Sequence, residues 1–584
     1  MAPERTARVS MVAKIFGGLS FSGDDGPICK KMALAAQRWP FVNLKTGIFS
    51  GGWFGETLPG RSEPWWRVDE NRELIYGKRD SLPDEKRGTI DSLPFDIQIV
   101  VRPQAGEVEL WSGIGSIPLF YAFDAANLII GTDPTVVCAG LRSAPELDPA
   151  GIMSLFALDY QTPTCTLFKQ VKRVPPLHRI KGGAAGWGEA VSYVRPFVSS
   201  FPRAGSRSVS EAAECLRRAM STAVREGEGI CLPLTGGVDS RTLLACLRPG
   251  ERVRSYTRGA PRDAEVVTAA KLAKIAGIPH QSFPFPVGYL ERSFPRVVHL
   301  TGGCVPANHS HAIHPLTQLA GQGVETIVPG TNGEFGRAFW PSQRFAGAAS
   351  ERDFWDRFFA VNFRSSEQVL RKVFRPPWDE ALVAAAHGLR NEYTAGMPVS
   401  GDAPQIDLDW IYLLRRIPLF IIWGPYVWNS AFRVAMPFMN FDYLRAVVGL
   451  PSGQRLGSSV HASVIKSGNP RLLKIPLVPS GRMLEPEIGE RWRVRWRLKK
   501  ASLMGISQRG PQRYDLWLRQ EAAFVESVLF SCQAAERGLF RIKGIRELWH
   551  DHLCGGDQTR MLCKLLTLEL ACRINVDGMS VTWD

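Results

Sequence analysis

The sequence feature that most constrains this chain is Leu-Pro-Leu-Thr-Gly-Gly-Val-Asp-Ser-Arg at residues 232–241. The apolar residues from Ile230 to Leu234 predict a buried strand, and the apolar run that follows Asp239 predicts a helix. Two glycines between them allow a tight turn without a Cβ penalty. Such a turn aims backbone N–H groups and a helix N-terminus at one point, and this predicts an anion site.

The side chains of this turn suit a nucleotide phosphate. Thr235 and Ser240 add hydroxyl donors, and Asp239 adds a carboxylate that can hold Mg²⁺. The spacing excludes the Walker loop, which needs Gly-x-x-x-x-Gly-Lys. The alternative is an ordinary strand-to-helix turn, because glycine pairs are common.

Composition narrows the class of protein. A chain of 584 residues with 45% hydrophobic and 22% charged residues predicts a folded protein of two or three domains. The net charge of +15 favours anionic partners. The eleven cysteines include no Cys-x-x-Cys pair, so we expect reduced thiols and neither a zinc ribbon nor a disulfide framework.

No segment predicts export or membrane insertion. Residues 1–10 lack the apolar core of a signal peptide. The most apolar later stretch, 411–436, is interrupted by Arg415, Arg416, Pro418 and Arg433. We therefore expect a cytoplasmic protein without a membrane span.

The first third of the chain has the pattern of an antiparallel sheet. Apolar runs at 96–101, 107–111, 119–123 and 128–131 are separated by turn residues. The Gly-x-Gly at 113–115 is not a dinucleotide fingerprint, because Pro118 replaces the third glycine. Residues 198–209 predict a linker, and Ser208 with Glu211 predicts a capping box at the start of a helix.

Strands and helices then alternate. Strands are predicted at 230–234, 253–257 and 325–328, with a helix at 263–276. This alternation indicates a doubly wound parallel sheet, which binds ligands at the carboxyl ends of its strands. The turn at 235–240, Thr257 and Gly330 all follow or end such strands.

Several of these segments resemble one family. The turn at 235–240 is similar to the Ser-Gly-Gly-x-Asp-Ser loop of ATP pyrophosphatases, with Thr235 in place of the first serine. Residues 11–13, 115–121 and 166–176 resemble glutamine-dependent asparagine synthetases, whose mature start is Met-Cys-Gly. Here Val12 replaces the cysteine nucleophile, so we expect no ammonia release from glutamine.

The resemblance implies the domain organisation. Residues 1–197 would form an α+β glutaminase-like sandwich of the Ntn type, and residues 198–209 a linker. Residues 210–584 would form an α/β doubly wound ATP pyrophosphatase domain with a helical C-terminal extension. The segment 559–573, which has apolar residues at helical spacing, resembles the closing helix of that domain.

The resemblance also implies binding residues. The segment 329–336 resembles the Gly-x-Gly-x-Asp segment of asparagine and β-lactam synthetases, with Glu334 for the aspartate and Asn332 for a glycine. It assigns magnesium to Asp239 and Glu334, and places Thr331 where those enzymes carry a catalytic Glu or Tyr. It assigns ATP to Leu234, Thr235, Gly236, Gly237, Asp239, Ser240, Thr257 and Gly330.

A third segment implies a catalytic cation. Residues 433–440 resemble Arg-x-Pro-Phe-Leu-Asp, with Asn440 in place of the aspartate. The family then places a lysine that neutralises the transition state and the departing pyrophosphate, where a fixed cation supplies several kcal/mol. The candidates are His461, Lys466 and Lys474, and we select Lys466. The alternative is that all three are surface charges.

The sequence leaves the function of two clusters of residues open. His309, His311 and His314 could bind a transition metal, but no second ligand cluster accompanies them, so lining a substrate cleft is preferred. Residues 491–500 interleave cations with tryptophans and predict a solvated helix, an edge strand, or a site for an acidic peptide or nucleic acid, with nucleic acid ranked last.

The functional hypothesis is an ATP-dependent, amide-forming ligase that uses ATP and Mg²⁺ and lacks glutaminase chemistry. The resemblance to lasso-peptide macrolactam synthetases implies a precursor peptide as substrate and a leader-peptidase or leader-binding protein as partner. Alternatives are a β-lactam-synthetase-like enzyme, an ammonia-using ligase on a sugar or metabolite, and a non-catalytic binding protein on the same fold.

Overall fold

The computed structural model describes residues 10–11, 14–21, 25–40, 42–49, 52–59, 66–68, 74–76, 97–114, 117–124, 127–224, 227–248, 251–338, 345, 347–363, 366–401, 403–455, 458–485, 490–508 and 510–583. The predictions made for Val12, Ala13, Gly115 and Ser116 lie outside these residues.

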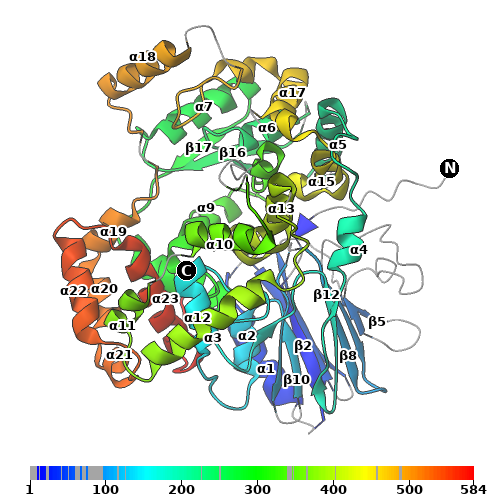
Figure 1. Cartoon of the computed structure of the whole chain (residues 1–584), viewed down its shortest axis with the longest axis vertical. Helices are drawn as coiled ribbons and strands as arrows, with labels where there is room; N and C mark the ends of the chain where they lie inside the picture. The colour runs from blue at the N-terminus through cyan, green and yellow to red at the C-terminus, as the bar shows by residue number, and fades with distance from the viewer. Residues whose placement is uncertain are drawn as a thin grey trace.

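Two antiparallel sheets form the N-terminal part, at the lower right of Figure 1. The first sheet has the order β11 (Lys172–Arg173), β9 (Phe120–Asp124), β10 (Asn127–Gly131), β2 (Lys14–Ser20), β4 (Gly52–Pro59), β3 (Val42–Phe49). The second has the order β13 (Gly186–Trp187), β12 (His178–Gly183), β8 (Glu107–Ser112), β7 (Gln98–Arg102), β6 (Leu74–Tyr76), β5 (Trp66–Val68), and β14 (Val191–Ser192) pairs with β12. Every residue of β2 is buried. Helices α1 (Asp25–Ala36) and α2 (Pro134–Gly140) pack on the first sheet.

A six-stranded sheet forms the centre of the C-terminal part. Its order is β1 (Ser10–Met11), β19 (Arg433–Ala435), β18 (Thr326–Ile327), β15 (Ile230–Pro233), β16 (Val253–Arg258), β17 (His280–Phe283). The last five strands are parallel, as the alternation of strands and helices predicts, and β1 joins antiparallel at the edge. The strand β1 thus belongs to the C-terminal sheet, although it lies within the first 197 residues.

Helices flank this sheet and extend it. They include α5 (Val209–Ala223), α6 (Asp239–Ala245), α7 (Ala264–Ala276), α8 (Tyr289–Thr301), η2 (Ala307–Ala312), α9 (Leu316–Ala320), η3 (Gly333–Arg337), η6 (Pro437–Met439), α15 (Phe441–Val448), α16 (Ser452–Arg455), α17 (Ser459–Gly468) and η7 (Pro470–Lys474). The helix α18 (Glu490–Leu503) lies at the top of Figure 1.

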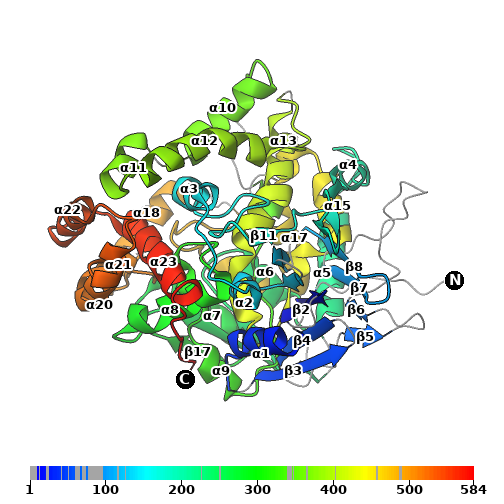
Figure 2. The same cartoon turned by 90° about the horizontal axis from the view of Figure 1, so that it is seen from below.

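Figure 2 shows two further groups of helices, one along the top of the view and one at its left. One contains α10 (Glu351–Asn362), α11 (Glu367–Val373), α12 (Trp378–Thr394), α13 (Pro404–Ile411), the π-helix η5 (Tyr412–Ile421) and α14 (Trp423–Trp428). The other contains α19 (Tyr514–Gln520), α20 (Ala522–Leu529), α21 (Cys532–Glu536), α22 (Ile542–Leu553) and α23 (Thr559–Asn575).

The two parts of the chain share a polar interface. The helix α12 packs on α3 (Pro149–Leu158), and its Glu392 accepts hydrogen bonds from the Thr162 hydroxyl at 2.7 Å and the Thr164 N–H at 3.0 Å. Asp159 pairs with Lys564 of α23 at 2.8 Å. Residues 159–164 of the N-terminal part are therefore held by polar contacts from α12 and α23.

The predicted linker is packed rather than free. Its first residues complete α4 (Val194–Ser199), and the Phe201 ring meets Trp410 edge-on at 5.2 Å between centroids. The capping box is confirmed, since the Ser208 hydroxyl accepts from the Glu211 N–H and Glu211 accepts from the Ser208 N–H.

Two compositional predictions can be compared with the structure. All eleven cysteines lie in the described part of the chain, and none forms a disulfide. Among the described residues, no helix has the length and apolar character needed to cross a membrane.

Candidate functional site

The candidate site lies where the parallel sheet reverses its strand order. From β15 the chain continues to β16 and β17 on one side and returns to β18 on the other. The carboxyl ends of β15 and β18 therefore open into a crevice at a topological switch point, where open α/β sheets bind ligands. The loop 234–240 follows β15 and the loop 328–337 follows β18.

The loop after β15, called here the phosphate loop (residues 234–240), is held by its own hydroxyls. The Thr257 hydroxyl donates to the Leu234 carbonyl at 2.6 Å. The Thr235 N–H donates to Ser240 Oγ at 3.0 Å, and the Gly237 N–H donates to Thr235 Oγ1 at 3.2 Å. These bonds preform the turn before any ligand arrives.

Glycine is required at the centre of this loop. A Cβ on Gly236 would lie 2.5 Å from Cγ2 of Val478, so no larger residue fits without a shift. The Gly236 N–H donates to Glu265 Oε2 of α7 at 2.7 Å. Burial raises the pKa of Glu265, although the Gly236 bond opposes this. The loop thus already holds an anionic oxygen, and a phosphate at this N–H must displace or share with Glu265.

Arg241 holds the phosphate loop from the interior of the protein, where a ligand cannot reach its side chain. Its side chain is fully buried, and it donates to the carbonyls of Gly236 at 3.1 Å, Leu472 at 3.2 Å and Pro476 at 3.2 Å. Burial lowers the pKa of Arg241 to about 10. The residue therefore joins the phosphate loop to the 470–476 segment.

The second loop packs directly on the first. A Cβ on Gly330 would lie 2.6 Å from the Ser240 nitrogen, and one on Gly333 would lie 2.6 Å from Asp239 Cβ. Asn332 takes a left-handed conformation with φ of 70°, which asparagine tolerates better than most residues. Thr331 is partly buried within this turn. The two glycines let the loops touch, and this brings Glu334 towards Asp239.

Asp239 has two basic neighbours that were not predicted together. Arg337 donates from Nε to Asp239 Oδ1 at 3.1 Å and from its terminal nitrogen to Oδ2 at 2.8 Å. His461 Nε2 lies 3.1 Å from the same Oδ1. Burial alone would raise the pKa of Asp239, but His461 and Arg337 outweigh it and hold the pKa below its usual value.

Glu334 has the opposite electrostatics. Burial and then the charge of Asp239 raise its pKa, and a hydrogen bond from Tyr412 of the π-helix opposes that rise. Two carboxylates with pKa values moved in opposite directions are thus placed side by side, which is frequent at functional sites.

The donor set fits Mg²⁺ bound together with a nucleotide. Mg²⁺ is usually held by one or two carboxylates plus phosphate oxygens, and Asp239 with Glu334 supplies two carboxylates. Within the described residues no group of three or more His, Cys, Asp or Glu side chains gathers to form a complete metal site. Arg337 neutralises Asp239, so a metal and Arg337 would compete for that carboxylate.

Of the three predicted cations, the structure brings one to the site. His461 of α17 is fully buried, and its ring stacks on Phe438 with centroids 5.6 Å apart. Lys466, which the sequence analysis selected, lies exposed five residues further along α17, and Lys474 is also exposed. A helical step of five residues turns the side chain to another face, so counting along the sequence could not separate these positions.

Asn440 has a local role. Its Oδ1 accepts from the Tyr443 N–H at 3.1 Å and caps α15. Asparagine and aspartate serve equally well as N-caps, so the departure from the family's aspartate preserves this function.

The three histidines do not form a metal site. Burial lowers the pKa values of His309, His311 and His314 to about 4, 3 and 4. His311 Nδ1 lies 3.2 Å from the Asn308 carbonyl, and His314 Nε2 lies 3.0 Å from the Pro284 carbonyl. The rings therefore contact backbone carbonyls of two different segments instead of a common point.

The basic segment at 491–500 lies within helix α18, which has no buried residue. Trp492 and Trp496 are 70% and 53% exposed. The segment is therefore a solvent-exposed helix and not an edge strand, and its binding of an acidic peptide or nucleic acid stays a prediction.

Sequence reasoning missed Glu265 and Arg337. Glu265 lies in the first turn of α7, where an acid is also expected merely to complement the helix dipole. Arg337 follows Glu334 by three residues in the 3₁₀ helix η3, but nothing in the sequence indicates that it faces Asp239.

The fold is an α/β domain built on a parallel sheet, and a glycine-containing loop and two carboxylates lie at its switch point. Residues 211–364 match the family model described as asparagine synthase, which supports membership of the asparagine synthetase superfamily. The matched residues include both loops of the site. No curated protein matches the chain.

The family match supports an ATP-dependent, amide-forming ligase in general terms. The matched residues do not include the sandwich, so the glutaminase-like nature of residues 1–197 stays a prediction.

Proposed function

We propose that the chain activates a substrate carboxylate with ATP and joins it to an amine. One observation carries this proposal: the phosphate loop and the 328–337 loop meet at the switch point and place Asp239 beside Glu334, Arg337 and His461. A site that handles phosphate needs anchored donors, metal ligands and fixed cations, and this cluster contains all three.

The chemistry divides into two steps. The substrate carboxylate attacks the α-phosphorus of ATP, and pyrophosphate leaves. The amine then attacks the acyl carbon, AMP leaves, and the amine loses a proton. When bound, Mg²⁺ supplies charge neutralisation for the phosphates.

The chain's own residues would bind and orient the reactants. Thr235 and Ser240 would bind phosphate oxygens, and Asp239 with Glu334 would hold the metal. Arg337 would place positive charge beside the developing negative charge, and His461 Nε2 would lie beside Asp239.

The nucleophile is proposed to be an amine on the substrate itself. Val12 stands where a glutaminase nucleophile is expected, so ammonia from glutamine has no source within the chain. A peptide that carries both an acidic side chain and a free N-terminal amine fits this need, as in macrolactam formation on a lasso-peptide precursor. Positioning of the two groups can contribute about 7–11 kcal/mol. A leader-peptidase or leader-binding protein is the proposed partner.

A second candidate, a non-catalytic binding protein on the same fold, is favoured by one observation. Arg337 forms a two-point ion pair with Asp239, and Glu265 occupies the Gly236 N–H, so side chains of the protein already bind both polar groups. In that case ATP would bind weakly, and no pyrophosphate would form.

Mass spectrometry separates these functions. With the precursor peptide, ATP, Mg²⁺ and the partner protease, a macrolactam loses the elements of water, about 18 Da, because an internal amine captures the acyl group. Acetylation of the peptide's first amine should abolish that loss, and AMP with pyrophosphate should accumulate in step with product.

Other outcomes would redirect the assignment. Ammonia as nucleophile lowers the mass of the acid by only about 1 Da, since an amide replaces the acid. Loss of water with a blocked amine would indicate an ester or imide. ADP with phosphate would overturn the pyrophosphatase assignment.

A further inference from the structure

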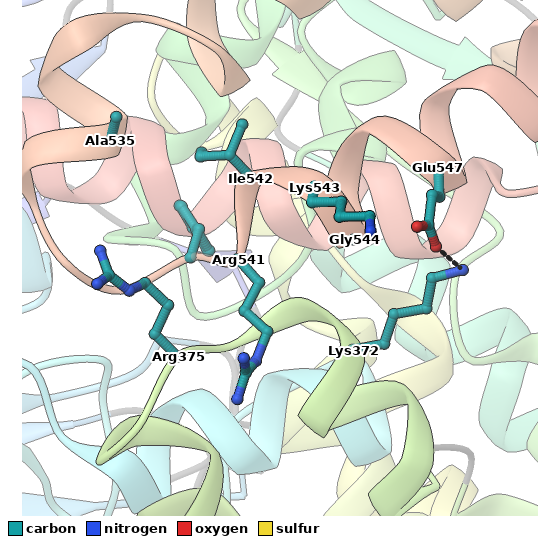
Figure 3. A pocket seen from close by; sticks show the side chains of 9 residues that line it. Lys372, Arg375, Ala535, Arg541, Ile542, Lys543, Gly544 and Glu547 are labelled. Carbon is teal, nitrogen blue, oxygen red and sulfur yellow. Dashed lines mark ion pairs between the residues drawn. The ribbon is translucent and has the colours of Figure 1, made fainter.

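A cavity of about 490 Å³ lies between α11 and α22, on elements separate from the switch point. Figure 3 shows its lining, and Figure 1 places α11 and α22 at the left of the molecule, away from α6 and β16. Phe374 and Phe540 pair as an antiparallel bridge at its base, with the Arg541 N–H donating to the Val373 carbonyl at 2.7 Å. The bridge fixes the two segments that carry the lining side chains.

The lining of this cavity, called here the basic pocket, is strongly cationic. It contains four cations, Lys372, Arg375, Arg541 and Lys543, against one acid, Glu547. Glu547 pairs with Lys372 at 3.0 Å. The lining residues therefore carry a net charge of +3, and one of them, Arg541, pairs with Asp379 outside the lining.

The cations divide into anchored and available groups. Arg541 donates to the Phe374 carbonyl at 2.7 Å and to Asp379 at 3.2 Å, so its guanidinium is held in place. Arg375 and Lys543 are exposed, and neither forms an ion pair within the part of the chain that the structure describes. Two cations are thus available to a ligand beside a fixed guanidinium.

A helix N-terminus adds to the same site. The twelve-residue helix α22 begins at Ile542, and its N-cap, Arg541, makes no side-chain capping bond. The first N–H groups of a helix have no intrahelical acceptor, and the helix dipole adds partial positive charge there. A Cβ on Gly544 would clash with the Lys372 backbone, so glycine lets this first turn approach α11 closely.

We propose that the basic pocket binds a soluble small molecule that carries a phosphate-type group with two or more negative charges. Arginine forks, lysines and helix N-terminal N–H groups are the donors that bind such oxyanions. The volume exceeds that of a single phosphate and lies within the range of small-molecule sites, so the ligand carries further atoms. Ile542 and Phe540 offer these atoms an apolar wall. The inference does not depend on the proposed ligase function.

Hydrogen exchange on the full chain tests this inference, with inorganic pyrophosphate as the probe. Pyrophosphate should slow exchange in a peptide that covers 542–553. In Arg375→Gln/Lys543→Gln the concentration needed for half-protection should rise about tenfold or more, because two charge-assisted contacts are lost. The matched control Arg491→Gln/Lys499→Gln removes the same charge from α18 and should behave as the unmodified chain.

The readout is local, so it distinguishes the two sites. A peptide covering 232–247 reports on the phosphate loop and should respond equally in all three proteins. Absence of protection at 542–553, equal loss in the control, or equal protection by sodium chloride at the same ionic strength would overturn the proposal. Unchanged thermal unfolding of both variants shows that the pocket, and not the fold, was altered.

Discussion

The two sheet systems of this chain bury charge in different ways. In the antiparallel sandwich, Arg38 pairs with Asp133, and both side chains are almost fully enclosed. At the carboxyl edge of the parallel sheet, Asp239 and Arg337 also pair, but they keep 21% and 34% of their side-chain surface exposed. The first pair is positioned for packing and the second for contact with a ligand.

Strand direction explains the difference. The carboxyl ends of parallel strands lie at one edge, so the loops after β15 and β18 converge on one crevice. Neighbouring strands of an antiparallel sheet run in opposite directions, so the carboxyl ends of its strands are divided between the two ends of the sheet. The buried charges of the sandwich instead serve its junction with the rest of the chain. Lys14 lies 3.6 Å over the Tyr426 ring, for example, and burial and then Arg38 lower its pKa well below the usual value.

The largest effect is expected from removing the exposed acid. Asp239→Ala should lower substrate-dependent pyrophosphate formation by about a thousandfold, because the proposed function makes Asp239 a metal ligand beside the reacting phosphate. Thermal unfolding should change little, since the ion pair is partly exposed. Pyrophosphate release and circular dichroism on the same samples measure both. A variant that keeps full activity would contradict the role given to Asp239.

Removing the buried acid, Asp133, should lower stability and leave activity nearly unchanged. Asp133 caps α2 by accepting from the Thr135 N–H at 3.0 Å and also pairs with Arg38. Asp133→Ala would leave a buried guanidinium unpaired and should cost about 3–5 kcal/mol of unfolding free energy. Denaturant unfolding measures the loss, and pyrophosphate formation per folded molecule should stay within about twofold. If activity falls and stability does not, the contrast between the two pairs is wrong.

The next prediction separates two residues of α17, His461 and Lys466. His461→Gln should lower pyrophosphate formation by about a hundredfold, since it removes a buried group beside Asp239. Lys466→Gln removes an exposed cation from the same helix and should leave the rate within about twofold. The reverse result would restore the choice made from sequence.

A smaller effect concerns acid stability. Burial lowers the pKa of His311 to about 3, so its ring is neutral in the folded chain and takes up a proton near its usual pKa of 6.5 when unfolded. The unfolded chain thus binds more protons, and stability falls as pH drops below about 6.5. Between pH 7 and 5 His311 should account for about 1–2 kcal/mol of that loss.

The measurement is the pH dependence of denaturant unfolding. The dependence should shrink in His311→Asn and stay unchanged in His387→Asn, which alters an exposed histidine. An unchanged slope in both variants would mean that His311 stays accessible to protons in the folded chain.

The last prediction is that the chain has no glutaminase activity. Incubation with glutamine should release no glutamate above background, because Val12 replaces the expected cysteine nucleophile. Glutamate release measured by a coupled dehydrogenase assay would overturn this reading of residues 1–197.

Local sequence patterns were enough to predict several helices and strands. The strand predicted at 230–234 is observed at Ile230–Pro233, and the helix predicted at 263–276 at Ala264–Ala276. The capping box at Ser208 depends only on residues three positions apart, so it too could be predicted. The short strand at Thr326–Ile327 was also found, because a buried strand appears in sequence as a compact apolar run.

Contacts between residues that are far apart in the sequence could not be predicted from such local patterns. Arg337 lies 98 positions from Asp239, and His461 comes from another helix altogether. The edge strand β1 joins a sheet whose other strands begin more than 200 residues later, which no local pattern indicates.

By itself, the sequence determined the phosphate loop, since glycines, hydroxyls and an acid at that spacing predict an anion site wherever the strand lies. It also determined the alternation of strands and helices that builds the parallel sheet. Only the tertiary structure decided which cation reaches Asp239, because burial and side-chain direction, unlike spacing, depend on how α17 packs. The same holds for the basic pocket, whose cations come from the segments 372–375 and 541–543, which lie about 170 residues apart in the sequence and are joined by the Phe374–Phe540 bridge.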